Sequence, residues 1–113
     1  MEKKTLEGLT EEQVSFQLIL HSGNARSKLL QSLKQFREGQ EDEAFGLMKE
    51  AEEDLRHAHG IHFQLVQQEA GGEKTPFSLL LMHAEDHLMS TITIKELVGE
   101  LLPIFQSLKQ YRV

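Results

Sequence analysis

The apolar residues of this sequence recur every three or four positions over three long stretches, which is the spacing of amphipathic helices. The apolar positions of the first stretch are Val14, Leu18, Ala25, Leu29, Leu33 and Phe36. Those of the second, with one histidine among them, are Ala44, Leu47, Met48, Ala51, Leu55, Ala58, His62, Leu65 and Val66. No useful β alternation separates them, so we predict an all-α fold, an antiparallel three-helix bundle.

Glycine, proline and capping residues indicate where the first two helices begin and end. Thr10 to Gln13 fits a capping box, and the helix that it opens should run to Phe36 or Glu38 before Gly39. A polar turn then leads into the second helix, which Gly71-Gly72 should close.

The third helix is predicted to begin at Thr75-Pro76, a cap residue followed by proline, and to continue to about Lys109. Pro103 should kink or weaken it, and Gly60 in the second helix could permit close packing. We expect residues 1–113 to form a single domain, with residues 1–9 as a loose tail.

The third helix carries two separate stripes. The first stripe has ordinary spacing for burial in the bundle and consists of Phe77, Leu80, Leu81, Ala84, Leu88, Val98 and Leu102. The second stripe follows the spacing of a coiled coil through Leu79, His83, Asp86, Ser90, Thr93, Leu97, Leu101, Ile104 and Leu108. A lone three-helix subunit cannot bury both, so the pattern predicts that third helices of several subunits meet along the second stripe.

The middle of the second stripe is polar, and this requires a reason. Burial of Asp86 without a partner would cost several kcal/mol, by the order of magnitude for unpaired buried charge. Either this portion is simply exposed to solvent or sets helix register, or it forms a functional site between subunits.

Composition excludes several classes of function. The chain of 113 residues has a formal charge of -6, and its scattered basic residues argue against nucleic-acid binding. It has no cysteine, no apolar leader and no apolar run long enough to insert into a membrane. We therefore expect a cytoplasmic protein whose partners are proteins.

The segment from His83 to His87 is the main candidate for chemistry. His83 and His87 lie four residues apart on one helical face with Asp86 beside them, but Ala84 stands where a zinc protease would carry its glutamate. The spacing leaves open ordinary surface histidines, a metal site with Asp86 or Glu85, and phosphoryl relay through a nucleophilic imidazole.

Four further histidines are assigned no function. They are His21, His57, His59 and His62. Their positions are typical of packed or half-buried histidines on amphipathic helices, although His59 and His62 could pair or share a metal.

Three segments resemble the signatures of the lactose/cellobiose-specific IIA components of the bacterial sugar phosphotransferase system. They are residues 22–27 (SGNARS), 69–73 (EAGGE) and 78–89 (SLLLMHAEDHLM). Their order and spacing fit that family as well, and the resemblance covers roughly residues 14 to 110.

The resemblance implies a phosphotransferase component, a homotrimer of three-helix subunits that together form a nine-helix bundle. It implies that His83 accepts phosphate from the histidine carrier protein HPr and passes it to a cysteine of a separate IIB component. IIB would then phosphorylate a β-disaccharide such as lactose or cellobiose during its uptake through the membrane component IIC.

The resemblance also implies roles for two neighbours of His83. Asp86 would share a divalent metal ion, Mg or Zn, with its symmetry mates at the trimer axis, which relieves repulsion among three carboxylates. His87 would support the phosphoryl group. The family usually has Gln where this chain has Glu85, and a carboxylate there would repel a phosphohistidine unless it points away or is paired.

Two alternatives compete with this interpretation. One is a metal-binding structural helical trimer in which His83, Asp86 and His87 do no chemistry. The other is a two-component histidine phosphotransfer module, which should accept phosphate from a response regulator and not from HPr.

Overall fold

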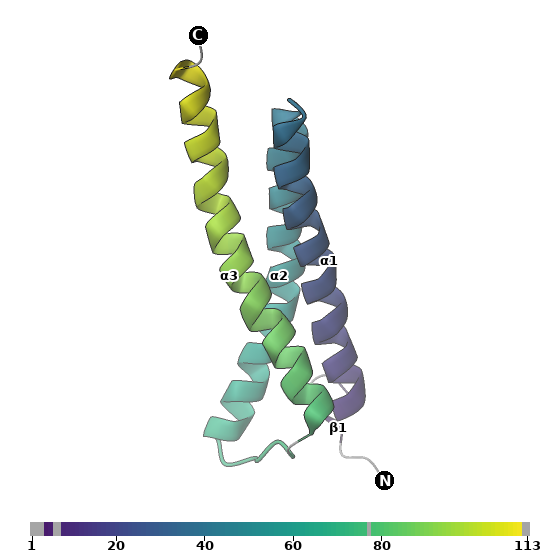
Figure 1. Cartoon of the computed structure of the whole chain (residues 1–113). Helices are drawn as coiled ribbons and strands as arrows, with labels where there is room; N and C mark the ends of the chain where they lie inside the picture. Colours follow the sequence, from purple (N-terminus) through teal and green to yellow (C-terminus); the bar gives the residue numbers. More distant parts are fainter. Residues whose placement is uncertain (1–3, 6–7, 77, 112–113) are drawn as a thin grey trace.

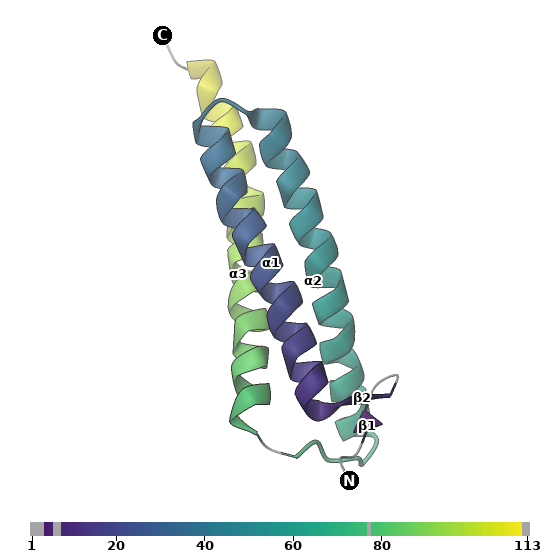
Figure 2. The same ribbon diagram turned by 90° about the vertical axis from the view of Figure 1, so that its right-hand side faces the viewer.

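The computed structural model describes residues 4–5, 8–76 and 78–111, and most of them belong to three long helices. Figures 1 and 2 show α1 and α3 running in one direction and α2 in the other, in an elongated bundle of 65 × 22 × 21 Å. The helices are α1 (Glu11–Arg37), α2 (Glu41–Ala70) and α3 (Leu79–Leu108), followed by the short 3-10 helix η1 (Lys109–Tyr111). The predicted all-α, antiparallel three-helix bundle is confirmed.

Two short strands precede the bundle. β1 (Lys4–Thr5) pairs antiparallel with β2 (Leu9–Thr10). The rest of the segment predicted as a loose tail, residues 1–3 and 6–7, lies outside the described residues apart from Gly8.

α1 begins as its capping box predicts. The Gln13 backbone N–H donates to Thr10 Oγ1 at 3.1 Å, and the Thr10 N–H donates to Gln13 Oε1 at 2.9 Å. The exchange satisfies two N–H groups that have no partner within the helix. After Arg37 the chain turns at Gly39, whose φ of +87° is a left-handed conformation that glycine adopts without strain.

The core lies along the line where the three helices meet. It contains most of the apolar positions that the periodicity selects. Its largest fully buried aliphatic side chains are Leu18, Leu29, Leu88, Leu102, Val14 and Val98. Val66 is an exception: it was predicted to face inward but is 47% exposed. Sequence periodicity also missed small polar residues of the core, Ser15, Ser22, Ser32 and Thr91.

Two of these serines are accommodated because their hydroxyl groups bond to their own helix. Ser15 Oγ donates to the Glu11 carbonyl oxygen at 3.1 Å, and Ser32 Oγ donates to that of Leu29 at 2.7 Å. A serine whose hydroxyl is satisfied in this way can replace an apolar residue at a close helix contact.

α3 begins three residues later than predicted. Its N-cap is Ser78, whose side chain accepts the Leu81 N–H at 3.0 Å, so the predicted cap at Thr75-Pro76 is wrong. Figures 1 and 2 show the reason: the end of α2 and the beginning of α3 lie apart at the same end of the bundle, so the link must span the distance between them. An extended residue spans about 3.3 Å along the chain, whereas a helical residue advances only about 1.5 Å. If α3 began earlier, fewer extended residues would remain and the link would be too short.

Neither Gly60 nor Pro103 ends the helix that contains it. Pro103 lies exposed inside α3, which continues beyond it to Leu108. A Cβ atom placed on Gly60 would meet no atom within 4 Å, so close packing inside this subunit does not require glycine there.

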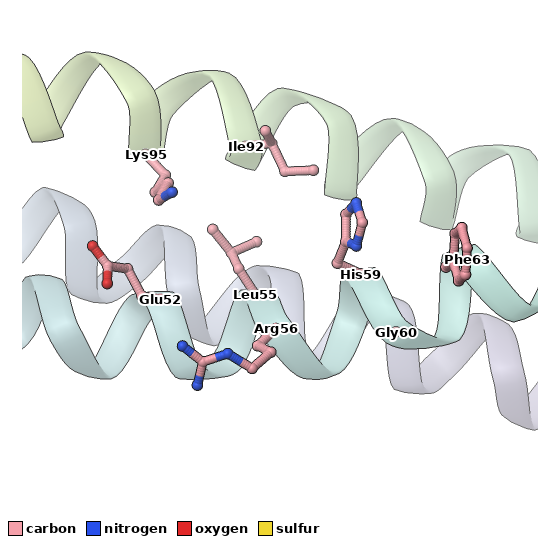
Figure 3. Close-up of a pocket in the computed structure, with 8 residues that line it drawn as sticks. All are labelled: Glu52, Leu55, Arg56, His59, Gly60, Phe63, Ile92 and Lys95. Carbon is pink, nitrogen blue, oxygen red and sulfur yellow. The ribbon is translucent and has the colours of Figure 1, made fainter.

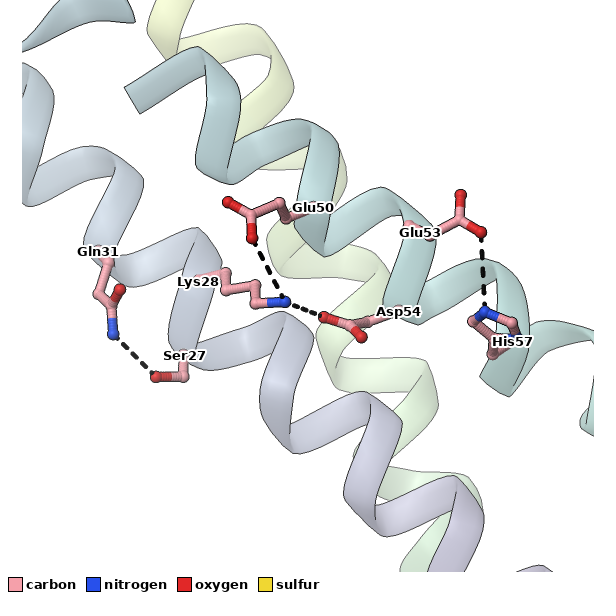
Figure 4. A network of polar contacts seen from close by, with 7 residues as sticks. All are labelled: Ser27, Lys28, Gln31, Glu50, Glu53, Asp54 and His57. Carbon is pink, nitrogen blue, oxygen red and sulfur yellow. Dashed lines mark hydrogen bonds and ion pairs between the residues drawn. The ribbon is translucent and has the colours of Figure 1, made fainter. Parts of the chain in front are cut away.

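An interhelical ion pair joins α1 to α2. Lys28 Nζ lies 2.8 Å from Asp54 Oδ2 and 3.9 Å from Glu50 Oε1, as Figure 4 shows. The hydrogen bond to Asp54 is the main reason that the pKa of Lys28 is raised above 10.5, with smaller electrostatic contributions from Asp54 and Glu50.

The Lys28 pair predicts a loss of stability in alkaline solution. Because the pKa of Lys28 is higher in the folded than in the unfolded protein, the charged lysine contributes its full stabilisation at pH values below the unfolded pKa of 10.5. This contribution is lost as the pH rises through the higher pKa of the folded state. Chemical denaturation at a series of pH values should show this decrease. Lys28→Met should reduce it, whereas Lys49→Met, at an exposed lysine of α2, should not. An unchanged alkaline profile in Lys28→Met would contradict the assignment.

The start of α3 can be tested by removing each candidate cap. Ser78→Ala should lower the free energy of unfolding by about 1 kcal/mol, because the Leu81 N–H loses its acceptor. Thr75→Ala should change it by less than about 0.5 kcal/mol, as is usual for a surface residue. Urea unfolding of both variants measures the difference, and a larger effect at Thr75 would place the helix start there.

Candidate functional site

α3 has one buried face and one exposed face, and these correspond to the two stripes. Of the first stripe, Ala84, Leu88, Val98 and Leu102 are buried, Leu80 and Leu81 are partly buried, and Phe77 lies outside the described residues. On the second stripe Leu79 is 73% exposed and Leu97 is 59% exposed, and Ile104 and Leu108 are also exposed. A single subunit therefore leaves a long apolar stripe of α3 uncovered.

The predicted site residues lie on this exposed face, near the beginning of α3. His83 and Asp86 are exposed, and His87 is partly buried. The imidazole rings of His83 and His87 are in contact, with centroids 4.5 Å apart and planes at 90°. The structure thus brings the two histidines together and leaves His83 open to solvent.

His87 has unused hydrogen-bonding capacity. Its Nδ1 atom is shielded from solvent and has no hydrogen-bond partner among the described residues. An unsatisfied buried acceptor is less unusual than an unsatisfied buried donor. With Nδ1 as the acceptor, the ring N–H is assigned to Nε2, where it can be donated.

Glu85 points to a different helix. Its Oε2 atom lies 2.5 Å from Nδ1 of His62 on α2, and both side chains are about one quarter exposed. The carboxylate is thus paired and held on the α2 side of α3. His62 was assigned no function from the sequence, and its inward position at helical spacing was the only signal that it could face a partner.

The remaining histidines form contacts away from the His83 face. His21 on α1 stacks on His57 of α2 with centroids 5.3 Å apart, and His57 Nε2 lies 3.7 Å from Glu53 Oε1 (Figure 4). His59 and His62 have ring centroids 6.2 Å apart. These contacts give no reason to assign His21, His57 or His59 to the site.

No metal site within one subunit is supported. The described part of the chain contains no group of three or more His, Cys, Asp or Glu side chains that could hold a metal ion. The geometry therefore does not favour a site in which His83 and His87 bind an ion together with Asp86 or Glu85 of the same subunit.

A groove lies between α2 and α3. Figure 3 shows Ile92 and Lys95 extending from α3 toward Leu55 and His59 on α2. Its other lining residues are Glu52, Arg56, Gly60 and Phe63. None of the predicted site residues lines it, so the groove is separate from the histidine pair.

Among the described residues, no helix combines the length and the apolar character that crossing a membrane would require.

Comparison with known proteins gives a consistent result. The family described as "PTS system, Lactose/Cellobiose specific IIA subunit" matches residues 13–106. The oligo-beta-mannoside-specific EIIA component of Bacillus subtilis is 62% identical over 107 residues, which cover 95% of this chain and 97% of that protein.

Two solved structures are similar in fold and in sequence. The cellobiose-specific enzyme IIA of Bacillus anthracis has a TM-score of 0.83 and 45% identity, with 90% of this chain and 94% of the other covered. A IIA(Chitobiose)-HPr complex of Escherichia coli has a TM-score of 0.74 and 37% identity, with 87% and 95% covered. The resemblance carried by the three sequence signatures is confirmed.

Proposed function

The chain belongs to the lactose/cellobiose-specific IIA family of the sugar phosphotransferase system and is a phosphocarrier of that system, and we propose that it carries phosphate on His83. The observation that supports His83 is its exposed ring in contact with His87. It lies in the second turn of α3, and Figure 1 shows the beginning of α3 at one end of the bundle, where a donor protein could approach.

The proposed chemistry is two successive displacements at phosphorus. A lone pair of the neutral His83 ring attacks the phosphoryl group on the donor, the bond from phosphorus to the donor nitrogen breaks, and a new nitrogen–phosphorus bond forms on His83. A thiolate of the acceptor then attacks the same phosphorus, and His83 leaves with its lone pair restored. No oxidant, reductant or other co-reactant is required.

His87 is proposed to support the phosphoryl group. Its ring contacts that of His83, and the tautomer favoured by its shielded Nδ1 places a donor N–H on Nε2. A hydrogen bond from this group to a phosphoryl oxygen would stabilise the negative charge that arrives with the phosphate.

We propose HPr as the donor, the cysteine of a IIB component as the acceptor and a β-linked disaccharide as the sugar. The relative of known structure from Escherichia coli forms a complex with HPr, which supports the choice of donor. This chain has no cysteine, so a thiol acceptor must be supplied by another protein. The sugar is proposed from the names of relatives that are specific for oligo-beta-mannoside or cellobiose.

We further propose that three subunits assemble through the second stripes of their α3 helices. The support is the row of exposed apolar side chains, which include Leu79, Leu97, Ile104 and Leu108. Burial of an apolar side chain of this size is worth about 1.5–3 kcal/mol, so contact between copies removes a substantial penalty.

Asp86 is the residue of this chain that would hold a divalent metal, Mg or Zn, together with the Asp86 residues of two further subunits. Its carboxylate is exposed, lies among the residues of the second stripe and has no ion pair among the described residues. Three such carboxylates brought together repel one another, and a carboxylate-bound cation would neutralise them. The metal therefore fits the donor set, with a structural role.

The site can be tested by phosphorylation in a purified system. Incubation with enzyme I, HPr and phosphoenolpyruvate should add one acid-labile phosphate per chain, because a phosphorylated imidazole hydrolyses in acid. Intact-protein mass spectrometry detects it. His83→Ala should accept none, and His87→Ala should be phosphorylated more slowly because the proposed support is lost.

His57→Ala serves as a matched control, since this exposed histidine lies on another helix. Full labelling of His83→Ala would end the proposal. Labelling by a phosphorylated response regulator, with none by HPr, would instead favour a two-component module.

The metal at the subunit interface can be tested through assembly. Treatment with a chelator should shift the native protein from trimer toward monomer, because three Asp86 carboxylates are then unneutralised. Asp86→Asn should remain trimeric in chelator, and added Mg²⁺ or Zn²⁺ should restore the native trimer. Light scattering measures the mass, and equal resistance of the two proteins to chelation would contradict the metal role of Asp86.

A further inference from the structure

Glu85 creates an electrostatic problem for a phosphocarrier. It lies two residues after His83 and carries a negative charge close to the group that must accept an anionic phosphoryl group. An uncompensated carboxylate within roughly 10 Å, the reach that helix geometry allows, would oppose this transfer. The chain must therefore remove this charge from the site or neutralise it.

The contact between Glu85 and His62 holds this charge away from the site. Glu85 Oε2 and His62 Nδ1 are 2.5 Å apart, and both atoms are shielded from solvent. Among the described residues, neither atom makes a hydrogen bond of regular geometry with any group, so this close contact is the only polar neighbour recorded for either atom. A bare nitrogen lone pair facing a carboxylate oxygen at this distance would be repelled, so we assign the ring proton of His62 to Nδ1, on the side of the carboxylate.

Helix geometry places this contact on a different side of α3 from the phosphate. Residues two apart on an α-helix point in directions about 200° apart, so Glu85 faces α2 while His83 faces outward. The pair therefore holds the carboxylate in the space between α2 and α3.

We propose that His62 is a positioning residue for phosphoryl transfer: its ring on α2 holds the Glu85 carboxylate away from His83 and screens its charge. This inference rests on the proposed function of His83. His62 itself does not touch the phosphate. Its contribution is to make a carboxylate tolerable in the phosphorylation motif.

The proposal predicts an asymmetry between the two partners. His62→Ala leaves a partly buried carboxylate without its donor, and the free charge should lower the equilibrium constant for phosphoryl transfer from HPr by about three- to tenfold, for one charge at roughly 10 Å. Glu85→Gln removes the charge and retains an acceptor for His62, so it should stay within about twofold of the native protein.

The double variant separates charge from folding. If the effect of His62→Ala is carried by the Glu85 carboxylate, then His62→Ala with Glu85→Gln should recover the native equilibrium. A merely structural role for the ring would leave the double variant as impaired as His62→Ala. His62→Asn should also recover most of the transfer, because its amide nitrogen can donate from nearly the position of Nδ1.

The experiment measures the phosphorylated fraction of the full-length protein at equilibrium with known ratios of phosphorylated and free HPr. Circular dichroism of each variant confirms helix content, and His57→Ala is the matched control because it breaks an exposed His–Glu contact on the same helix. If His62→Ala does not fold, Glu85→Gln and His62→Asn carry the test.

Three results would overturn the proposal: a native equilibrium in His62→Ala, an uncorrected defect in the double variant, or a large defect in His62→Asn. They differ from failure of the proposed function, which would appear as phosphorylation of His83→Ala or as no transfer from HPr to the native chain.

Discussion

The structure depends on one constraint: α3 is apolar on two faces, and a bundle of three helices can bury only one of them. The core side of α3 packs through residues such as Leu88 and Leu102, while Leu79 and Leu97 remain in water. α1 and α2 are arranged so that they cover the first apolar face of α3. The second face explains why the proposed chemistry lies on the outer side of a helix and not in a pocket of one subunit.

The charges of α3 are arranged by the same division. Glu85 faces α2 and contacts His62, whereas Asp86, the next residue, is exposed on the outer side of α3. One carboxylate is thus balanced within the subunit, and the other has no partner in it. Successive residues of an α-helix point in directions about 100° apart. Glu85 therefore bears on the charge near the phosphoryl group, whereas the adjacent Asp86 bears on the assembly of subunits.

The sequence predicted those features that depend on local spacing. The capping box at Thr10, the two stripes of α3 and the neighbourhood of His83 and His87 follow from residues three or four apart, and the structure has them. The start of α3 at Ser78 was missed because it depends on the distance that the link must span between the end of α2 and the beginning of α3. The contact of His62 with Glu85 was missed because it joins residues of two helices whose register no local pattern encodes.

Because α3 runs the length of the bundle, its beginning and the end of the described chain lie at opposite ends of the molecule, as Figure 1 shows. From His83 to Leu108 the helix rises roughly 37 Å, at about 1.5 Å per residue. A domain fused after Tyr111 would therefore extend from the far end of the bundle and leave the histidine pair unobstructed. The fold thus permits covalent linkage to a partner domain without loss of access for an independent one.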